Sequence, residues 1–301
     1  MINLAYILSA SYSGSTLLTF LLGTHPKIGT IGELKATARG NVDQYYCSCG
    51  KLIHQCEFWQ QVGKELAQKN VTFDITNFGT HFCCNSSRFA DRLLRAAVRG
   101  TVFEKLRKVG LNFSPTARQQ FKKILDKNKA VIDAVLKLQK ATVFLDGSKD
   151  PIRLKYLSDS GYWNIKAIFL TRDGRGAANS YMKHHCVDMK TAAIEWKRCN
   201  EEAENILHGL NKSQWIEVRY EELCNNTENT LVRLFDFLGL DPSKRAQDFH
   251  SVENHILGNE MRMNTTSQIR LDEKWKSVLK DEELKIFDFE AGKMNRRYEY
   301  K

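Results

Sequence analysis

Eight residues near the N-terminus, Ser9 to Thr16, have the composition and placement of a phosphate-binding loop. They read Ser-Ala-Ser-Tyr-Ser-Gly-Ser-Thr and lie between an apolar run and an apolar helical pattern. In such a loop, backbone N–H groups and the start of the next helix surround a phosphate. Ser15 stands where a Walker A loop has its lysine, which disfavours nucleoside triphosphate chemistry. The alternative is a tight strand-to-helix turn made possible by Gly14.

The segments around this loop predict a strand, a loop and a helix in succession. Leu4 to Leu8 is a continuous apolar run typical of a buried parallel strand, and Thr16 to Leu22 reads as a helix that Gly23 ends. Three further strand patterns follow, each separated from the next by helical stretches: Thr142–Leu145, Ile165–Leu170 and Trp215–Val218. This alternation predicts an α/β fold in which a P-loop-type parallel sheet is flanked by helices.

Between about residues 42 and 140 the pattern is mostly helical. Helices are expected over Phe89–Leu106 and Thr116–Leu138, with breaks around Gly110 and Pro115. The chain has 301 residues, only four prolines and no linker-like stretch. We therefore expect one domain over residues 1–301, with residues 42–140 as a helical insertion.

The net charge of +10 raises the possibility of a nucleic-acid partner. However, the 45 basic residues are interspersed with 35 acidic ones, and an anionic small ligand explains the excess equally well. No apolar run approaches the length of a membrane span, and the N-terminus lacks a targeting pattern. These features predict a cytoplasmic protein without a transmembrane segment and without a nucleic-acid partner.

Three of the eight cysteines, Cys47, Cys49 and Cys56, form a Cys-x-Cys-x6-Cys pattern. This pattern lacks the paired Cys-x2-Cys spacing of zinc ribbons, although His54 could supply a fourth ligand. We expect reduced or locally packed thiols, because free cysteine usually behaves as a small hydrophobic residue. Zinc and a disulfide are the alternatives.

The loop Tyr12-Ser13-Gly14-Ser15-Thr16 resembles the 5′-phosphosulfate loop of the sulfotransferase family, in particular its bacterial and tyrosylprotein-type members. The resemblance implies that these five residues bind 3′-phosphoadenosine 5′-phosphosulfate (PAPS) as co-substrate, without a metal. The basic residue of the family's loop would fall at Tyr12, so this chain lacks a cation there.

A second segment, Phe169 to Ser180, is similar to the block that binds the 3′-phosphate in this family. The similarity implies that Arg172 and Ser180 contact that phosphate. Arginine offers a planar fork of donors to a phosphate dianion, and a hydroxyl at a helix start would complete the site. Without the first motif, Arg-Asp-Gly-Arg at a strand end could equally be a salt-bridged turn.

Two short segments resemble the acceptor side of the tyrosylprotein-type members. Gly32-Glu33-Leu34 is similar to their Gly-Glu segment, which implies that Glu33 is the catalytic base. Ser148-Lys149-Asp150-Pro151 resembles their Lys-Asp-Pro segment, which implies that Lys149 approaches the bridging oxygen of the donor. The alternatives are an exposed loop carboxylate and a surface lysine.

Three further residues are expected to contact the nucleotide. Val218 to Leu223 resembles a strand end whose tyrosine contacts adenine, which implies that role for Tyr220. Gly258 to Arg262 and Asp272 to Trp275 resemble a segment that closes over the nucleotide, with Arg262 and Arg270 as phosphate contacts. A sheet tyrosine and a solvated basic loop are the alternatives.

These features predict a sulfotransferase that moves a sulfuryl group from PAPS to a hydroxyl acceptor by in-line transfer, with a carboxylate base. The alternatives are a phosphotransferase on a related P-loop fold and a basic nucleic-acid-binding module. A sugar, a lipid, a phenol or a peptide tyrosine could each be the acceptor.

Overall fold

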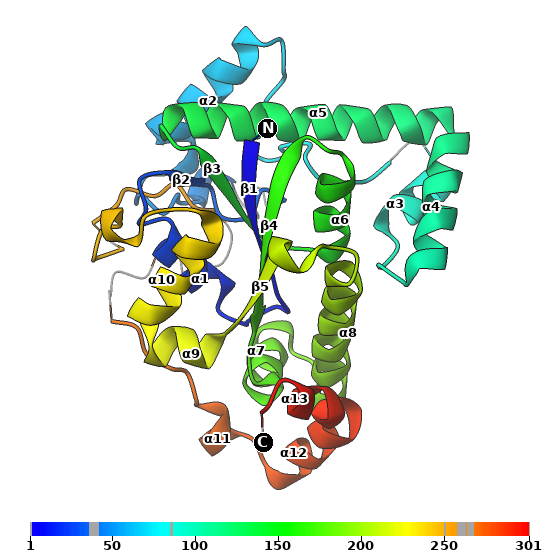
Figure 1. Ribbon diagram of the computed structural model, residues 1–301, viewed down its shortest axis with the longest axis vertical. Coiled ribbons are helices and arrows are strands. Elements are labelled where there is room, and N and C mark those ends of the chain that lie inside the picture. Colours follow the sequence, from blue (N-terminus) through cyan, green and yellow to red (C-terminus); the bar gives the residue numbers. More distant parts are fainter. Residues whose placement is uncertain are drawn as a thin grey trace.

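The computed structural model describes residues 2–35, 42–84, 87–249, 251–257, 263 and 268–300. Five parallel strands form one sheet in the order β2-β3-β1-β4-β5 (Figure 1). The strands are β1 (Ile2–Leu8), β2 (Ile28–Thr30), β3 (Val143–Lys149), β4 (Trp163–Thr171) and β5 (Trp215–Arg219). The expected parallel α/β fold is therefore confirmed.

The central strand β1 supplies side chains to two hydrophobic cores, one on each face of the sheet. Leu4, Tyr6 and Leu8 belong to one core, whereas Ala5 and Ile7 belong to the other. Successive residues of a strand point to opposite faces, so a strand covered on both sides is apolar at every position. The continuous apolar run in the sequence has this physical cause.

Helices cover both faces of the sheet (Figure 1). On one face lie α1 (Ser15–Leu22), α9 (Tyr220–Asn225) and α10 (Thr227–Leu238). The other face and its margins carry the remaining longer helices, α2 (Glu57–Gln68), α3 (Arg88–Arg95), α4 (Thr101–Phe113), α5 (Pro115–Leu138), α6 (Pro151–Asp159), α7 (Gly174–His185) and α8 (Met189–Leu207). Near the C-terminus follow α11 (Trp275–Val278), α12 (Asp281–Phe287), the π-helical turn Asp288–Gly292 and α13 (Lys293–Arg297).

The region between β2 and β3 is largely helical, as expected, but the single helix predicted over Phe89–Leu106 is wrong. The chain forms α3 and α4 instead, with an irregular segment between them. The buried guanidinium of Arg107 supplies a hydrogen-bond donor to the backbone of that segment, because its Nη2 donates to the carbonyl of Ala97 at 2.7 Å. A buried side chain thus replaces the helical hydrogen bonds that are missing at the break.

The expected break at Gly110 is also wrong, because α4 continues through it to Phe113. A Cβ at Gly110 would lie 2.9 Å from Leu93 Cδ2, so the glycine permits α3 and α4 to approach each other. Pro115 is the first residue of α5, where its missing N–H costs no helical bond. The proline therefore starts a helix, and the break precedes it.

None of the helices in the described part of the chain combines the length and apolar character needed to cross a bilayer.

Candidate active site at the carboxyl ends of the strands

Every strand of the sheet carries predicted site residues where it ends. The loop of residues 9–14 follows β1, and Glu33 lies just beyond β2. Lys149 is the last residue of β3, Arg172 follows β4, and Tyr220 follows β5. Parallel strands bring their carboxyl ends to one edge of a sheet, where open α/β folds bind ligands.

A cavity of about 1130 Å³ opens at this edge. Its lining includes ten of the predicted site residues: Tyr12, Gly14, Ser15, Thr16, Glu33, Lys149, Arg172, Ser180, Tyr220 and Arg270. Ser13 is buried in the loop behind the lining, and Arg262 lies outside the described residues. Residues that are widely separated in the sequence thus share one cavity.

Several polar groups of the loop have no hydrogen-bond partner among the described residues. Gly14 precedes α1 with a φ of +90°, and no side chain in the described structure caps the helix. The hydroxyls of Ser9 and Ser13 are buried and have no partner among the described residues. Because buried polar groups nearly always have a partner, this loop has the character of an anion site.

Arg172 connects the loop to the C-terminal part of the chain. Its Nη1 donates to the carbonyl of Tyr12 at 2.7 Å, and its Nη2 contacts Asp272 Oδ2 at 3.2 Å. The guanidinium lies over the ring of Tyr220, 4.6 Å from the centroid. Arg172 therefore lies directly beside the phosphate-type loop, although 160 positions separate it from Tyr12.

Ser180 lines the cavity from a position different from the one expected. It lies in the middle of α7, not at the helix start, and its Oγ donates to the carbonyl of Gly176 at 3.1 Å. A hydroxyl that bonds its own helix in this way still has lone pairs to accept from, and it can rotate to donate to a ligand.

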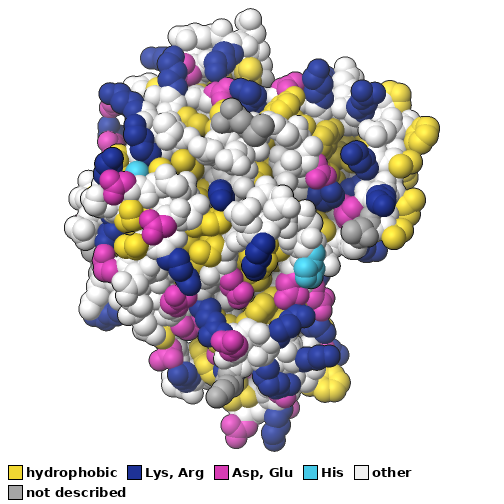
Figure 2. Space-filling view, in the orientation of Figure 1, with side chains coloured by type: hydrophobic (Ala, Val, Ile, Leu, Met, Phe, Trp, Pro, Cys, Tyr) yellow, Lys and Arg dark blue, Asp and Glu magenta, His cyan; other side chains and the backbone are white. Residues whose placement is uncertain are grey.

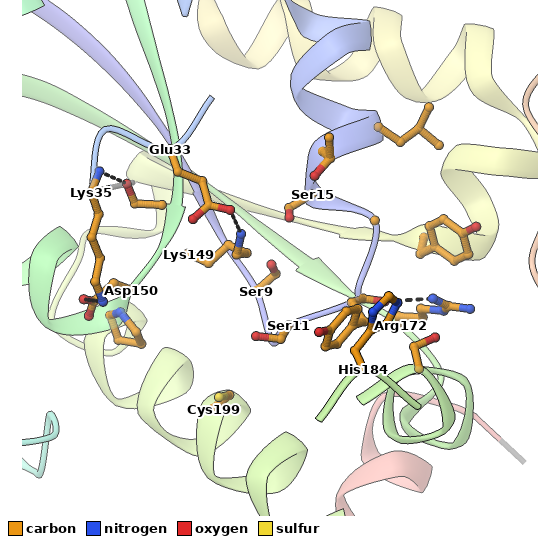
Figure 3. A pocket seen from close by; sticks show the side chains of 18 of the residues that line it. Ser9, Ser11, Ser15, Glu33, Lys35, Lys149, Asp150, Arg172, His184 and Cys199 are labelled. Carbon is orange, nitrogen blue, oxygen red and sulfur yellow. Dashed lines mark hydrogen bonds and ion pairs between the residues drawn. The ribbon is translucent and has the colours of Figure 1, made fainter. Parts of the chain in front are cut away.

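Glu33 and Lys149 point toward each other and form an ion pair at the cavity wall (Figure 3). Lys149 lies beside Leu8 of the central strand, which places it next to the start of the loop. The N–H of Gly147 donates to the carbonyl of Gly32 at 2.8 Å, so the two strand ends that carry the pair are bonded directly to each other.

A buried carboxylate fixes this pair of strand ends. Asp146 Oδ1 accepts from the N–H of Leu34 at 3.2 Å and from the N–H of Ser148 at 3.0 Å. Asp146 Oδ2 accepts from Arg153 Nε at 2.9 Å, and both charged groups are buried. Pairing with Arg153 offsets the cost of burying the Asp146 carboxylate. Its hydrogen bonds to Leu34 and Ser148 hold the backbone directly next to Glu33 and next to Lys149.

Comparison with known proteins identifies the family. Residues 5–244 match the sulfotransferase family. This chain belongs to the sulfotransferase family. No curated protein matches it.

Solved sulfotransferases are similar to this one along nearly the whole chain. The sulfotransferase domain from the curacin biosynthetic pathway is 16% identical, with a TM-score of 0.51 over 95% of this chain and 96% of that one. The sulfotransferase domain from the Synechococcus PCC 7002 olefin synthase is 16% identical, with a TM-score of 0.45 over 96% and 95%. The sulfotransferase from Alicyclobacillus acidocaldarius is 11% identical, with a TM-score of 0.43 over 95% and 94%. The first of these likenesses shows a shared fold.

Sequence reasoning missed two histidines that line the cavity of this sulfotransferase. The ring of Tyr12 stacks on His184 with 4.9 Å between centroids, and its hydroxyl lies 3.2 Å from His185 Nε2. Burial raises the pKa of the Tyr12 phenol above its ordinary value, which favours the neutral form. The loop position at which the resemblance led us to expect a basic residue is therefore an aromatic ring in contact with α7. Only their place at the end of α7, within reach of the loop, could have indicated these histidines.

Sequence reasoning also missed the wall that α8 contributes to the sulfotransferase cavity. Arg198 and Glu202, one helical turn apart, both line the cavity and form an ion pair. Burial raises the pKa of the Glu202 carboxyl by more than the neighbouring Arg198 lowers it, so the net pKa shift is upward. The cavity wall therefore includes partly buried carboxylates besides Glu33, and Glu202 is one of them.

The alternative in which His54 supplies a fourth ligand to the cysteine pattern is wrong. His54 is half exposed and lies 3.8 Å from Asp43. The histidine beside Cys47, Cys49 and Cys56 is His255, about 200 positions later in the chain. Local spacing favoured His54, whereas the fold brings the distant residue into place.

Proposed function

We propose that this sulfotransferase transfers the sulfuryl group of PAPS to a hydroxyl group of its acceptor. In the reaction, the acceptor oxygen forms a bond to sulfur while the bond between sulfur and the bridging phosphate oxygen breaks. The acceptor loses its hydroxyl proton, and the departing bisphosphate keeps the electron pair of the broken bond. The protein must therefore align two molecules, accept one proton and neutralise one developing charge.

The observation that carries the proposal is that one cavity is lined by two anion-binding regions and by the Glu33–Lys149 pair. The first region is the loop before α1, with its uncapped helix start. The second comprises Arg172 and Ser180, and Arg172 is in direct contact with that loop. An adenosine with phosphates at both the 5′ and 3′ positions has the two anionic ends that such an arrangement would bind.

Glu33 and Lys149 have the two charges that the transfer needs. Glu33 would take the acceptor proton, and Lys149 would neutralise the bridging oxygen of the leaving phosphate. The two groups form an ion pair with each other. The donor offers Lys149 a second anionic partner, which would free the Glu33 carboxylate for the proton.

Nucleotide binding tests this function against the two alternatives. Calorimetry should show 3′-phosphoadenosine 5′-phosphate (PAP) binding in the presence of EDTA, and ATP binding far more weakly with or without Mg²⁺. A phosphotransferase would show the opposite order, because its nucleotide contact depends on metal. Isotope-labelled PAPS with a panel of hydroxyl acceptors then tests transfer itself, and no labelled product with any acceptor class would contradict the proposal.

The surface bears on the nucleic-acid alternative. On the face in Figure 2, lysine and arginine side chains alternate with aspartate and glutamate over most of the area. A nucleic-acid site requires a continuous basic area, and affinity for RNA would fall steeply with salt. Competition by RNA without competition by PAP would favour that alternative.

Gly14→Ala should weaken PAP binding by about tenfold or more. A Cβ at this position would lie 2.4 Å from Tyr220 Cδ2, and the φ of +90° is unfavourable for alanine. The loop or the tyrosine must move, and both line the donor cavity. Calorimetric titration with PAP measures the loss.

Gly161→Ala is the matched control for this substitution. Gly161 has a φ of +70°, and a Cβ added there would meet no described atom within 4 Å, so the control carries the backbone cost without the contact. It should lower the melting temperature slightly and leave PAP affinity unchanged. If Gly14→Ala behaved in the same way, the close packing of loop and Tyr220 would be irrelevant to binding.

A further inference from the structure

Four metal-ligating side chains converge outside the lining of the active-site cavity. They are Cys47, Cys49, Cys56 and His255, and their ligand atoms all lie within 4.8 Å of one another. Cys47 and Cys56 are almost fully buried, and Cys49 and His255 are partly buried. The proposed reaction uses none of these groups.

The distances within this cluster are those of a tetrahedral metal site. His255 Nδ1 lies 3.4 Å from Cys56 Sγ and 3.7 Å from Cys47 Sγ, and Cys49 Sγ lies 3.7 Å from Cys56 Sγ. In tetrahedral zinc sites, bonds of about 2.3 Å to sulfur and about 2.0 Å to nitrogen separate the ligand atoms by roughly 3.5–3.8 Å. A disulfide needs its sulfurs at about 2.05 Å. The observed spacing therefore favours one ion among four ligands over a sulfur–sulfur bond.

The backbone around the cysteines is arranged for thiolates. The chain turns tightly at Cys47–Lys51, where Cys47 N–H donates to the carbonyl of Lys51 at 3.0 Å and Gly50 has a φ of +82°. The amide of Cys49 donates to the sulfur of Cys47, and the amide of Lys51 donates to the sulfur of Cys49. Amide donors of this kind stabilise the charge of metal-bound thiolates.

Cys56 has the same kind of environment at the start of a helix. It is the N-cap of α2, which places it at the N-terminal end of that helix. The N-terminal end of a helix favours a negative charge. Cys47 and Cys49 thus have backbone amides near their sulfurs, and Cys56 lies at a helix N-terminus.

The imidazole of His255 is held with Nδ1 toward the sulfurs. Its ring stacks on Phe58, with centroids 4.3 Å apart and an angle of 4° between the planes. On the opposite side, His255 Nε2 lies 3.6 Å from a carboxylate oxygen of Glu253. Metal-bound histidines commonly direct their second nitrogen to a carboxylate, which orients the ring and strengthens the ligand.

We propose that Cys47, Cys49, Cys56 and His255 bind a structural zinc ion. Four protein ligands leave no open position, so the ion would have no catalytic water. It would join the turn at residues 47–56 to residues 251–257, which already share hydrogen bonds such as Ile256 N–H to Ser48 Oγ at 2.8 Å.

The joined segments lie next to the active site. Leu257 N–H donates to the carbonyl of Ile31 at 3.0 Å, and Leu257 pairs with Gly32, the residue before Glu33. Through Leu257, the ion would therefore stabilise the backbone at Ile31 and Gly32, directly before Glu33.

Elemental analysis of the purified protein tests the site. We expect one zinc per chain in the wild type, lost in Cys56→Ser and in His255→Ala. His54→Ala and Cys186→Ser are matched controls, because neither residue belongs to the cluster and both variants should keep the metal. Loss of zinc in His54→Ala with retention in His255→Ala would overturn the assignment.

A spectroscopic measurement on the wild type covers the case in which the cysteine variants fail to fold. Replacing zinc with Co²⁺ should give the intense visible bands of tetrahedral cobalt and a sulfur-to-cobalt charge-transfer band in the near ultraviolet. Chelation of the native ion should lower the melting temperature. A wild-type protein that contains no zinc and takes up no Co²⁺, or one whose Cys49 and Cys56 form a disulfide by mass spectrometry, would refute the site.

Discussion

Glu33→Gln should lower the turnover number by about two orders of magnitude or more, as expected for the loss of a general base. The amide has the same shape and can still contact Lys149, but it cannot accept a proton at pH 7. PAP should bind at least as tightly as to the wild type, because the uncharged amide competes less for Lys149. Single-turnover kinetics with PAPS, together with PAP titration, separates the two effects.

Glu202→Gln is the informative comparison, because Glu202 is a partly buried carboxylate of the cavity wall that belongs to α8 and not to a strand end. It should keep turnover within about threefold of the wild type, since its pairing with Arg198 on α8 leaves Glu33 unaffected. The reverse pattern, with an active Glu33→Gln and an inactive Glu202→Gln, would move the base to α8. Full activity in both variants would exclude both carboxylates.

Arg172→Ala should weaken PAP binding by about 30-fold or more, which corresponds to about 2 kcal/mol for a lost charged contact to phosphate. Arg172 is almost fully buried and contacts the loop, Asp272 and the ring of Tyr220. Some loss of affinity could therefore arise from a displaced loop. Titration with a second ligand separates these causes.

Adenosine 5′-monophosphate, which lacks the 3′-phosphate, is that second ligand. The wild type should bind PAP much more tightly than the monophosphate, and Arg172→Ala should bind the two almost equally, because the coupling between residue and phosphate is then lost. Arg175→Ala removes the same charge three residues later, where the guanidinium pairs with Asp173 and lies over Trp275. It should leave the preference for PAP intact. If Arg172→Ala still bound PAP much more tightly than adenosine 5′-monophosphate, another group of the protein would bind the 3′-phosphate.

The strongest sequence patterns predicted the fold well. The apolar runs of β1, β3 and β4 were identified because strands buried on both faces are largely apolar. The edge strand β5 includes the exposed Glu217 and was identified from its β-branched and aromatic residues instead. β2 was missed, since its three residues, Ile28–Thr30, are too short to show any periodicity. The break between α3 and α4 was missed because buried Arg107 makes it possible from outside the segment itself.

The candidate site was predicted as separate motifs whose mutual positions were unknown. The loop, Lys149, Arg172 and Tyr220 were each expected at the end of a strand, so a parallel sheet would bring them to one edge. Glu33 reaches the same edge through β2, which was not predicted. The strand order decided which of them are neighbours, and it put Lys149 beside the loop because β3 pairs with β1. The cavity wall from α8 had no motif, because Arg198 and Glu202 look like ordinary helix-surface charges in the sequence and acquire meaning only through helix packing.

By itself, the sequence determined the strand-loop-helix start, the residue types at the strand ends and the absence of a lysine in the loop. These are local properties, since backbone sterics, side-chain periodicity and chemical type act over a few residues. Only the tertiary structure decided that Glu33 meets Lys149, that Tyr12 stacks on His184, and that His255 rather than His54 faces the three cysteines. Such pairings depend on how segments that are distant in the sequence pack against each other. Sequence spacing cannot indicate them, because the contacts arise only when the sheet and its covering helices have formed.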